Sequence, residues 1–365
     1  MNIISIDKPL AAFAKFNTDV IVTGLAPYGN GHINDTFLVN SRKADGAPKR
    51  YILQAINTNV FKKPEQVMHN IEKVTSFLKT KTDDERKVMS LVKTRDGAAY
   101  HTDIDGRCWR LYDFIEDSLC LDLPETPEDF YQSAVAFGQF QNYLNEFPVS
   151  ELFETIPDFH NTPDRYRKFL AAVEADKVGR AKDVAEEIKF VKDRADFYSV
   201  LFDAQKAGKI PFRVTHNDTK INNVMLDLET RTALCVIDLD TIMPGFSVND
   251  FGDSIRFGAS TAAEDEKDLD KVWMDLDLFE SYAKGFLKGF GGLLTDDEIM
   301  MMPEGAKMMT IECGMRFLTD YLEGDTYFKT KYPEHNLDRC HTQFKLVWDM
   351  EQKWDKMKDI VKKHI

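Results

Sequence analysis

The sequence predicts an α+β chain with two lobes, a β-rich N-terminal lobe and a mostly helical C-terminal lobe. Between residues 19 and 56, short apolar segments alternate with polar and glycine-containing turns, which is typical of antiparallel strands. From residue 127 onward, apolar residues recur at helical spacing. The chain has 365 residues, which is long for one hydrophobic core and suits two lobes.

The N-terminal lobe is assigned to residues 1–112. A helix is expected over residues 64–80, because Pro64 suits a first helical turn and the apolar residues that follow share one face. Strands are expected at residues 21–25, 36–39, 50–56, 87–92 and 108–115.

Residues 113–118 are predicted to be the hinge between the lobes, because the last strand of the first lobe here runs toward a helical region. Residues 119–365 then form the C-terminal lobe, whose helical pattern is interrupted by strand-like segments between residues 213 and 240. Its helices are expected at residues 130–147, 164–175, 185–207, 276–288, 305–322 and 342–363.

The strand-like interruption carries the residues that most restrict the chemistry. Asp218 is followed five residues later by Asn223, and Asp238 ends the apolar run 233–237. Two short strands with a polar turn between them predict a hairpin that brings Asn223 close to Asp238. Protein kinases use this spacing to place a base for the acceptor hydroxyl and two metal ligands. We therefore interpret Asp218 as the catalytic base and Asn223 and Asp238 as Mg²⁺ ligands; the alternative is a polar turn between core strands.

Other residues around Asp218 have different expected roles. His216 is expected to be structural and to hold the loop. Lys220 is placed to stabilise charge on the transferring phosphoryl group, although it could also be a solvated loop lysine. Asp240 would share a strand face with Asp238 and is a weaker candidate for the metal.

Residues 250–252 spell Asp-Phe-Gly, the metal-binding tripeptide of protein kinases. This segment lies too far from Asp218 and reads as the start of a helix. We expect Asp250 and Asp253 either to cap that helix or to brace the catalytic loop.

A turn with Gly29 and Gly31 separates the first two predicted strands. Kinases cover ATP phosphates with the backbone N–H groups of such a turn, although hairpin turns are rich in glycine for other reasons. Because the Asp218 loop follows downstream, we interpret Gly29, Gly31 and the adjacent His32 as nucleotide-binding residues.

The third predicted strand departs from the protein-kinase pattern. Gln54 occupies the position at which protein kinases carry a phosphate-binding lysine. A glutamine amide donates hydrogen bonds but brings no charge, and it could also be an ordinary polar strand residue. We retain Gln54 as a nucleotide-binding candidate, together with Asp113 and Ile115 of the predicted hinge.

The composition excludes several classes of partner. A net charge of −14 and a sequence pI of about 5.1 argue against nucleic acid and anionic membranes, which are bound by clustered cations. The five cysteines form no Cys-x-x-Cys pair, so neither a disulfide framework nor a zinc site is indicated. No signal-peptide pattern or membrane-spanning apolar run is found. We expect a cytoplasmic protein and a monomer.

With these residues in place, the chain resembles the aminoglycoside phosphotransferase and choline kinase superfamily, small-molecule kinases with a protein-kinase-like two-lobed fold. Within it, the chain is most similar to N-acetylhexosamine 1-kinases, and the similarity runs along nearly the whole chain. DFGDSIRFGAST and ECGMRFLTDYLEGDTYFKTKYPEHNL lie outside the general kinase motifs and point to this subfamily. The other stretches that carry the resemblance are PYGNGHIN, RYILQ, RVTHNDTKINN and VIDLDTIMPG.

The resemblance implies ATP and Mg²⁺ as cofactors and phosphorylation of the anomeric hydroxyl of N-acetylglucosamine or N-acetylgalactosamine. It also implies that Arg316 and Tyr327 contact the sugar. The alternative is that Arg316 pairs with Glu312 or Asp320 at helical spacing. Glutamine at the strand-lysine position is shared with close relatives, so Gln54 departs only from the wider kinase pattern.

Two other functions remain open. The chain could phosphorylate another small alcohol, such as an amino alcohol, an aminoglycoside or a different sugar. It could also be a pseudokinase-like module that binds nucleotide without turnover, as the missing strand lysine would suggest. A protein kinase is disfavoured, because the segment after Asp238 has no room for an activation loop and no Ala-Pro-Glu motif.

Overall fold

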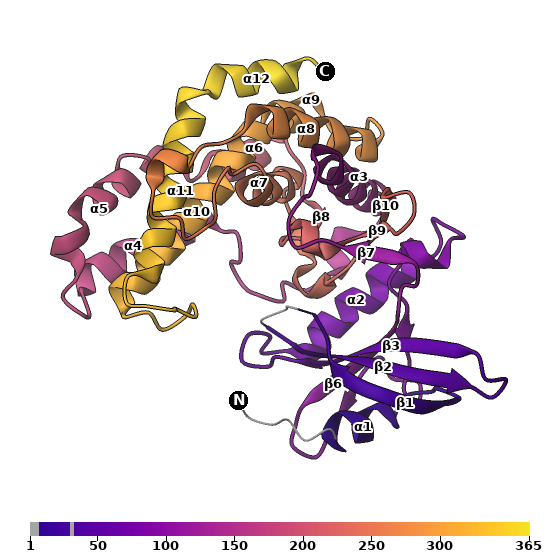
Figure 1. Cartoon of the computed structure of the whole chain (residues 1–365). Coiled ribbons are helices and arrows are strands. Elements are labelled where there is room, and N and C mark those ends of the chain that lie inside the picture. Colours follow the sequence, from indigo (N-terminus) through magenta and orange to yellow (C-terminus); the bar gives the residue numbers. More distant parts are fainter. Residues whose placement is uncertain (1–6, 30–32) are drawn as a thin grey trace.

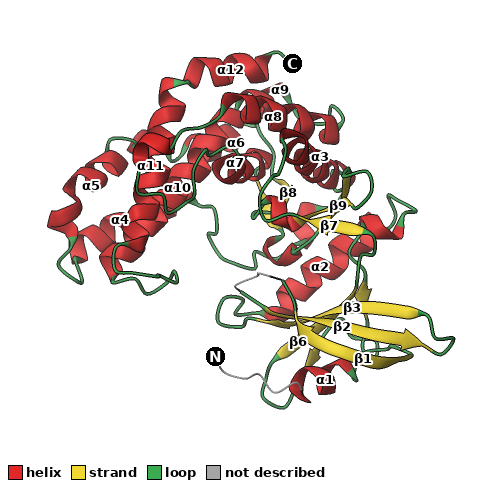
Figure 2. Ribbon diagram, viewed as in Figure 1, coloured by secondary structure: helices red, strands yellow, loops and turns green. Residues whose placement is uncertain are grey.

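A computed structural model describes residues 7–29 and 33–365 and has the two lobes that the sequence predicts (Figure 1). An antiparallel sheet dominates the N-terminal lobe and helices dominate the C-terminal lobe (Figure 2). The predicted α+β, kinase-like fold class is therefore confirmed. None of the described helices is both long and apolar enough to cross a membrane.

The N-terminal sheet runs in the order β1-β2-β3-β6-β4, and β5 also pairs with β6. Helix α1 (Asp7–Phe13) precedes the sheet, and α2 (Pro64–Leu78) follows β3. The strands are β1 (Val20–Pro27), β2 (Asp35–Lys43), β3 (Pro48–Ile56), β4 (Leu91–Val92), β5 (His101–Thr102) and β6 (Cys108–Asp113).

The two faces of this sheet belong to different hydrophobic cores. Alternate residues of β3, among them Leu53, pack with Phe13 of α1 and Trp109 of β6 in a small core of their own. The apolar face of α2 instead joins the large core of the C-terminal lobe. Gln54 lies on the opposite side of β3 from Leu53, because successive strand residues point to opposite faces. It therefore faces away from the small core.

The C-terminal lobe is built on ten helices in the described residues. They are α3 (Pro127–Tyr143), α4 (Thr162–Ala175), α5 (Ala185–Lys192), α6 (Val200–Lys206), α7 (Ser247–Gly258), α8 (Leu276–Phe290), α9 (Asp296–Met300), α10 (Met302–Glu323), α11 (His335–Gln352) and α12 (Trp354–Lys362). Helices α7 and α10 approach closely, because a Cβ atom on Gly252 would collide with the backbone of Gly305. This contact sets the position of α7, which lies beneath the catalytic loop.

Two small sheets lie between these helices and the N-terminal lobe (Figure 1). One has the order β10-β9-β7 and the other pairs β11 with β8. Their strands are β7 (Ser118–Cys120), β8 (Arg213–Thr215), β9 (Val224–Asp227), β10 (Ala233–Val236) and β11 (Met243–Gly245). The predicted hinge segment lies between the end of β6 and the start of β7; its boundaries remain a prediction.

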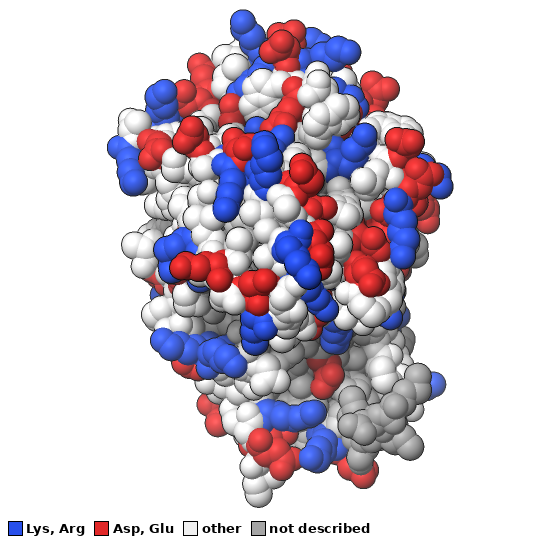
Figure 3. All heavy atoms as spheres, turned by 90° about the vertical axis from the view of Figure 1, so that its left-hand side faces the viewer, with Lys and Arg blue, Asp and Glu red and all other residues white. Residues whose placement is uncertain are grey.

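Acidic and basic side chains are interspersed over the face shown in Figure 3. The net charge of −14 is therefore not gathered into one patch on this face.

Candidate active site

The predicted hairpin is present and is formed by β9 and β10. The two strands pair antiparallel, with Val224 opposite Val236. The backbone N–H of Ile237 donates to the carbonyl oxygen of Asn223 at 2.9 Å. Asn223 at the start of one arm and Asp238 at the end of the other therefore lie at the same end of the hairpin, as the sequence predicts.

Three of the predicted site residues are in direct contact. Lys220 Nζ lies 2.8 Å from Asp218 Oδ1, and both side chains are about one-third exposed. Asn223 Nδ2 donates to Asp218 Oδ2 at 3.1 Å and to the Asp218 carbonyl oxygen at 2.8 Å. Because Nδ2 of Asn223 faces Asp218, Oδ1 on the other side of the amide faces away from Asp218 and is oriented to accept a metal ion or a hydrogen bond.

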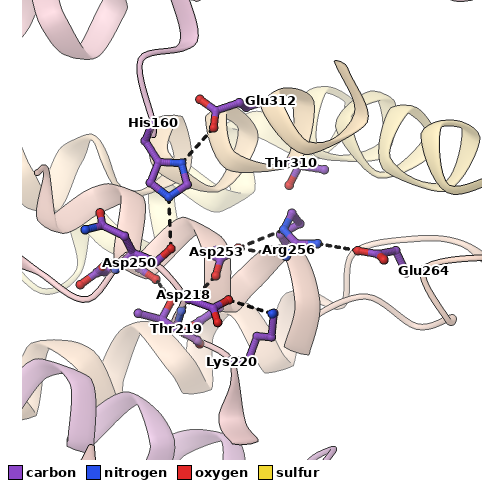
Figure 4. Close-up of polar contacts among 12 residues, drawn as sticks. His160, Asp218, Thr219, Lys220, Asp250, Asp253, Arg256, Glu264, Thr310 and Glu312 are labelled. Carbon is purple, nitrogen blue, oxygen red and sulfur yellow. Dashed lines mark hydrogen bonds and ion pairs between the residues drawn. The ribbon is translucent and has the colours of Figure 1, made fainter. Parts of the chain in front are cut away.

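Helix α7 braces the catalytic loop with two carboxylates (Figure 4). Asp250 has no exposed surface and accepts hydrogen bonds from the backbone N–H groups of His216 and Asn217, at 2.8 and 2.7 Å. Asp253 accepts from the backbone N–H of Thr219 at 3.0 Å. The bracing role predicted for these aspartates is confirmed. The capping alternative is wrong, because α7 begins after Phe246 without a side-chain cap.

His216 ties the loop to the strand that carries Asp238. The imidazole is fully buried, with Nε2 2.8 Å from the carbonyl oxygen of Ile237. Its Nδ1 accepts from the backbone N–H of Asp218 at 3.3 Å. The prediction that His216 is structural is therefore confirmed.

Two residues of the site have left-handed backbone conformations, Asn217 with φ 65° and Asp238 with φ 58°. Such conformations are costly for residues other than glycine and persist only where surrounding contacts enforce them. The Asn217 side chain is held by a 2.8 Å hydrogen bond to the carbonyl oxygen of Thr241. Hydrogen bonds to the surrounding structure therefore hold these left-handed conformations in place.

The electrostatics of the site favour a bound cation. The surrounding protein desolvates the Asp238 carboxyl, and this desolvation, with the charges of Asp240 and Asp218, raises the pKa of Asp238 to about 6. Part of the residue stays exposed and can still be reached by a ligand. Burial also opposes ionisation of Asp218, but the charge of Lys220 outweighs it and lowers the Asp218 pKa. A cation between these carboxylates would relieve their repulsion.

The chemistry of the donors suits Mg²⁺. In the part of the chain that the structure describes, no group of three or more His, Cys, Asp or Glu residues is arranged to hold a metal. Mg²⁺ keeps several waters and uses few protein oxygens. The side chains that could hold Mg²⁺ here are those of Asp238, through its carboxylate, and Asn223, through its amide oxygen.

Sequence reasoning missed a set of contacts between the lobes. Arg110 on β6 is 1% exposed and forms an ion pair with Asp240, which is 3% exposed. Asn34 Nδ2 donates to the other oxygen of Asp240 at 2.7 Å. Arg110 Nε also donates to Gln54 Oε1 at 3.0 Å. Of these residues, the sequence analysis singles out Gln54 as a nucleotide-binding candidate and Asp240 as a weaker metal candidate, and neither prediction includes the contact with Arg110.

Three of the other residues predicted to bind nucleotide, Gly29, Asp113 and Ile115, lie within the described residues. Gly29 has φ 78°, a left-handed conformation that glycine adopts without strain. Gly31 and His32 lie outside the described residues. Asp113 Oδ1 pairs with Lys49 Nζ at 2.5 Å, and the carbonyl oxygen of Ile115 accepts from Ser118 Oγ at 2.6 Å. Their roles in nucleotide binding remain predictions.

The two predicted sugar ligands lie together on the helical side of the loop. The Arg316 guanidinium is 6.0 Å from the Tyr327 ring centroid and is also close to the rings of Phe159 and Phe328. Tyr327 is 68% exposed, so its ring is accessible to a ligand.

Neither carboxylate at helical spacing from Arg316 pairs with it. Glu312 accepts from Thr162 and contacts His160, whereas Asp320 accepts from the backbone N–H groups of residues 326–328. The alternative of a helical ion pair is therefore wrong. Among the described residues Arg316 forms no ion pair.

Arg165 is a second cation in this region that sequence reasoning missed. Its Nε is buried and has no hydrogen-bond partner among residues 7–29 and 33–365, while Nη2 donates to the Phe159 carbonyl oxygen at 3.0 Å. Burial, and then the charge of Arg316, lower the pKa of Arg165. The two guanidinium groups thus lie close enough to repel each other.

A buried histidine connects this region to the catalytic loop (Figure 4). His160 Nδ1 lies 2.9 Å from Glu312 on α10, and Nε2 lies 3.2 Å from the carbonyl oxygen of Asn217. Burial opposes protonation of His160, but the charge of Glu312 outweighs it and raises the His160 pKa. The pair therefore fixes α10, with Arg316 one turn further on, relative to Asp218.

Comparisons with known proteins agree with this geometry. The profile of the APH family, described as "Phosphotransferase enzyme family", matches residues 24–282, more than half of the chain. An aminoglycoside phosphotransferase from Alicyclobacillus acidocaldarius is 12% identical with a TM-score of 0.63, over 98% of this chain and 97% of that one. A microcompartment-associated aminopropanol kinase is 15% identical with a TM-score of 0.58, over 96% and 98%.

A Plasmodium vivax ethanolamine kinase is 13% identical with a TM-score of 0.53, over 90% of this chain and 83% of that one. At such identities, the structural likeness establishes the fold alone. The family profile is more specific, and it covers the loop in which Asp218, Lys220 and Asn223 touch. The chain therefore belongs to the phosphotransferase enzyme family.

Proposed function

We propose that this phosphotransferase transfers the γ-phosphoryl group of ATP to the anomeric hydroxyl of an N-acetylhexosamine, N-acetylglucosamine or N-acetylgalactosamine. The observation that carries the proposal is the connection between the residues around Asp218 and the predicted sugar ligands Arg316 and Tyr327. The Asp218–Lys220–Asn223 cluster is linked, through His160 and Glu312, to Arg316, which pairs with no carboxylate in the described part of the chain, and to the exposed Tyr327.

The catalytic loop has the groups that the transfer needs. Asp218 is the group that orients the acceptor hydroxyl and accepts its proton, and its low pKa keeps it ionised at neutral pH. Lys220, held 2.8 Å from Asp218, stabilises charge on the transferring phosphoryl group. Asn223 and Asp238 would hold Mg²⁺, which neutralises phosphate charge when it is bound.

The surroundings of Arg316 favour a neutral acceptor with hydrogen-bonding oxygens. The half-buried Arg316 guanidinium forms no ion pair within the described residues, which leaves donors that a sugar hydroxyl or an acetamide oxygen can satisfy. The Tyr327 ring offers an apolar face with a hydroxyl at its edge. We choose an N-acetylhexosamine among such acceptors because the sequence resembles the N-acetylhexosamine 1-kinases.

A second candidate is a kinase for another small alcohol. The neighbouring structures include enzymes described as aminopropanol and ethanolamine kinases, which makes amino alcohols the natural competitor. An ammonium group would be repelled by Arg165 and Arg316, whereas a neutral sugar would not. We therefore rank the amino alcohol below the acetamido sugar.

An acceptor screen with detection of ATP consumption tests the proposal. We expect N-acetylglucosamine or N-acetylgalactosamine to be the best acceptor, with glucose poorer because it leaves the donors for the acetamide unpaired. Turnover of an amino alcohol or an aminoglycoside, without turnover of acetamido sugars, would select the second candidate. Nucleotide binding without phosphoryl transfer to any acceptor would support the pseudokinase alternative instead.

Phosphorus NMR of the product tests the position of transfer. The anomeric hydroxyl is the most acidic on the ring and the easiest for Asp218 to deprotonate, so the sugar 1-phosphate is expected. A 6-phosphate would refute the proposed orientation of the sugar.

A further inference from the structure

One feature of this site is unexplained: β3 carries Gln54, not a lysine, at the position where kinases hold the ATP phosphates. In kinases, a lysine at this place puts positive charge beside the ATP phosphates from the N-terminal lobe. Here that position is Gln54, and its partner across the sheet on β6 is Arg110. Side chains directly opposite on antiparallel strands lie on the same face with their Cβ atoms about 5 Å apart. Arg110 therefore starts from almost the same place as the missing lysine.

The contacts of Gln54 direct this arginine toward Asp240. Gln54 Nε2 donates to Thr36 Oγ1 at 3.0 Å, which fixes the amide with its oxygen toward Arg110. That oxygen accepts from Arg110 Nε at 3.0 Å. Gln54 thus orients a cation and does not itself need to be one.

The other end of the guanidinium meets the metal-binding turn. Arg110 Nη1 pairs with Asp240, two residues after Asp238. Both partners are almost completely buried, so neither charge is stable there without the other. The pair joins β6 of the N-terminal lobe to a turn of the C-terminal lobe, and Asn34 donates to the same carboxylate from the N-terminal side.

The charges of the cleft explain why a second cation is useful. Asp218, Asp238 and Asp240 bring three carboxylates to the place where a triphosphate would bind. Lys220 pairs with Asp218 on the C-terminal side of the cleft. The Asp240 carboxylate would repel the phosphates if it were not neutralised.

We propose that Arg110 replaces the β3 lysine: it supplies the positive charge of the N-terminal lobe from the neighbouring strand and, through Asp240, positions the metal-binding turn for the nucleotide phosphates. The inference rests on the proposed use of ATP but not on the identity of the acceptor. Arg110 is thus a positioning residue, and Lys220 is the cation beside the transferred group.

Direct binding measurements test this without an acceptor. Affinity for MgATP and for adenosine is measured by calorimetry on the wild-type protein and on Arg110→Gln. We expect Arg110→Gln to weaken MgATP binding by about 10- to 100-fold, the usual size of a lost charged hydrogen bond, and adenosine binding by no more than about twofold. Lys8→Met is the control, because it removes an exposed ion pair of the same lobe, between Lys8 and Asp105.

A rescue variant tests whether Arg110 acts through its positive charge or only by maintaining the local structure. In Gln54→Lys/Arg110→Gln, the cation returns to β3, and we expect MgATP affinity within about threefold of the wild type. This variant and Arg110→Lys also serve if Arg110→Gln does not fold, since both keep a positive charge at the site.

Several results would overturn the inference. MgATP binding by folded Arg110→Gln as tight as in the wild type would do so, as would equal losses of MgATP and adenosine affinity. Folded Gln54→Lys/Arg110→Gln or Arg110→Lys that keeps adenosine binding but loses MgATP binding would also overturn it. Failure of the proposed acceptor leaves all these measurements unchanged. Failure of the wild type to bind MgATP at all would refute the proposed function and this inference together.

Discussion

Replacement of Asp218 by asparagine removes one charge from the catalytic loop and leaves its shape almost unchanged. The carboxylate receives Lys220 on one oxygen and the Asn223 amide on the other. An asparagine of the same shape can keep one of these contacts but cannot accept the proton of an acceptor hydroxyl. The loop itself is held by Asp250 and Asp253 of α7, not by Asp218.

Two magnitudes follow from these contacts. A positioned base contributes about 10² to 10⁴-fold to the rate, so Asp218→Asn should raise the activation free energy by about 3–5 kcal/mol. The lost ion pair with Lys220 is partly exposed and should cost at most about 1 kcal/mol of folding free energy. A large effect on turnover is therefore expected together with a small effect on stability.

The assay combines turnover with the best acceptor, calorimetric MgATP binding and thermal unfolding. Asp227→Asn is a matched control, because Asp227 lies on β9 of the same hairpin and pairs with Arg86 away from the loop. The control should retain turnover within about twofold. Asp218→Asn that folds, binds MgATP and turns over at a near-normal rate would refute the assignment of the base.

Four further predictions concern the surrounding groups. Asp238→Ala should abolish turnover even in excess Mg²⁺, and EDTA should abolish it in the wild type; full activity in chelator would contradict the metal role. Lys220→Met should lower kcat by about 10²-fold or more with MgATP affinity little changed, and a reversed pattern would place Lys220 in ground-state binding. Arg316→Ala should raise the acceptor KM, or lower kcat, while the ATP KM stays constant; a changed ATP KM alone would argue against an acceptor site. Because Glu312 raises the pKa of His160 above its ordinary value of 6.5, the stability that the protonated histidine adds is complete below that pH and is lost as pH rises through the raised pKa. Thermal unfolding should thus separate wild type from His160→Gln more at about pH 6 than at about pH 9, and an equal separation would contradict a charged pair.

Local sequence determined the catalytic loop. The five-residue separation of Asp218 and Asn223 and the two short strands after them lie within one continuous stretch, so strand alternation and turn composition were sufficient to predict the hairpin. The same reasoning identified His216 as structural. Its imidazole contacts Asp218 and Ile237 within the same stretch, although the ring also packs against Phe137 and Phe140 of α3.

Helix boundaries were predicted less well where a helical pattern contains a local break. The helix expected over residues 185–207 is divided into α5 and α6, and between them Tyr198 turns back so that its hydroxyl donates to the carbonyl oxygen of Val191. Helical periodicity reports only the spacing of apolar residues, and it continues across such a break.

The choice of charge partners was decided by the tertiary structure alone. The chain has 47 Lys and Arg residues and 61 Asp and Glu residues, and helical spacing offered Arg316 two carboxylates that other groups engage in the structure. Arg110 and Asp240 are 130 residues apart, and they meet only because β6 pairs with β3 in the N-terminal lobe and that lobe contacts the turn after β10. The sequence by itself thus determined the loop from Asp218 to Asn223 and the hairpin that follows it, because these residues are neighbours along the chain. The tertiary structure decided that Arg110, opposite Gln54 on β3, pairs with Asp240, because burial makes a charge depend on the one partner within reach.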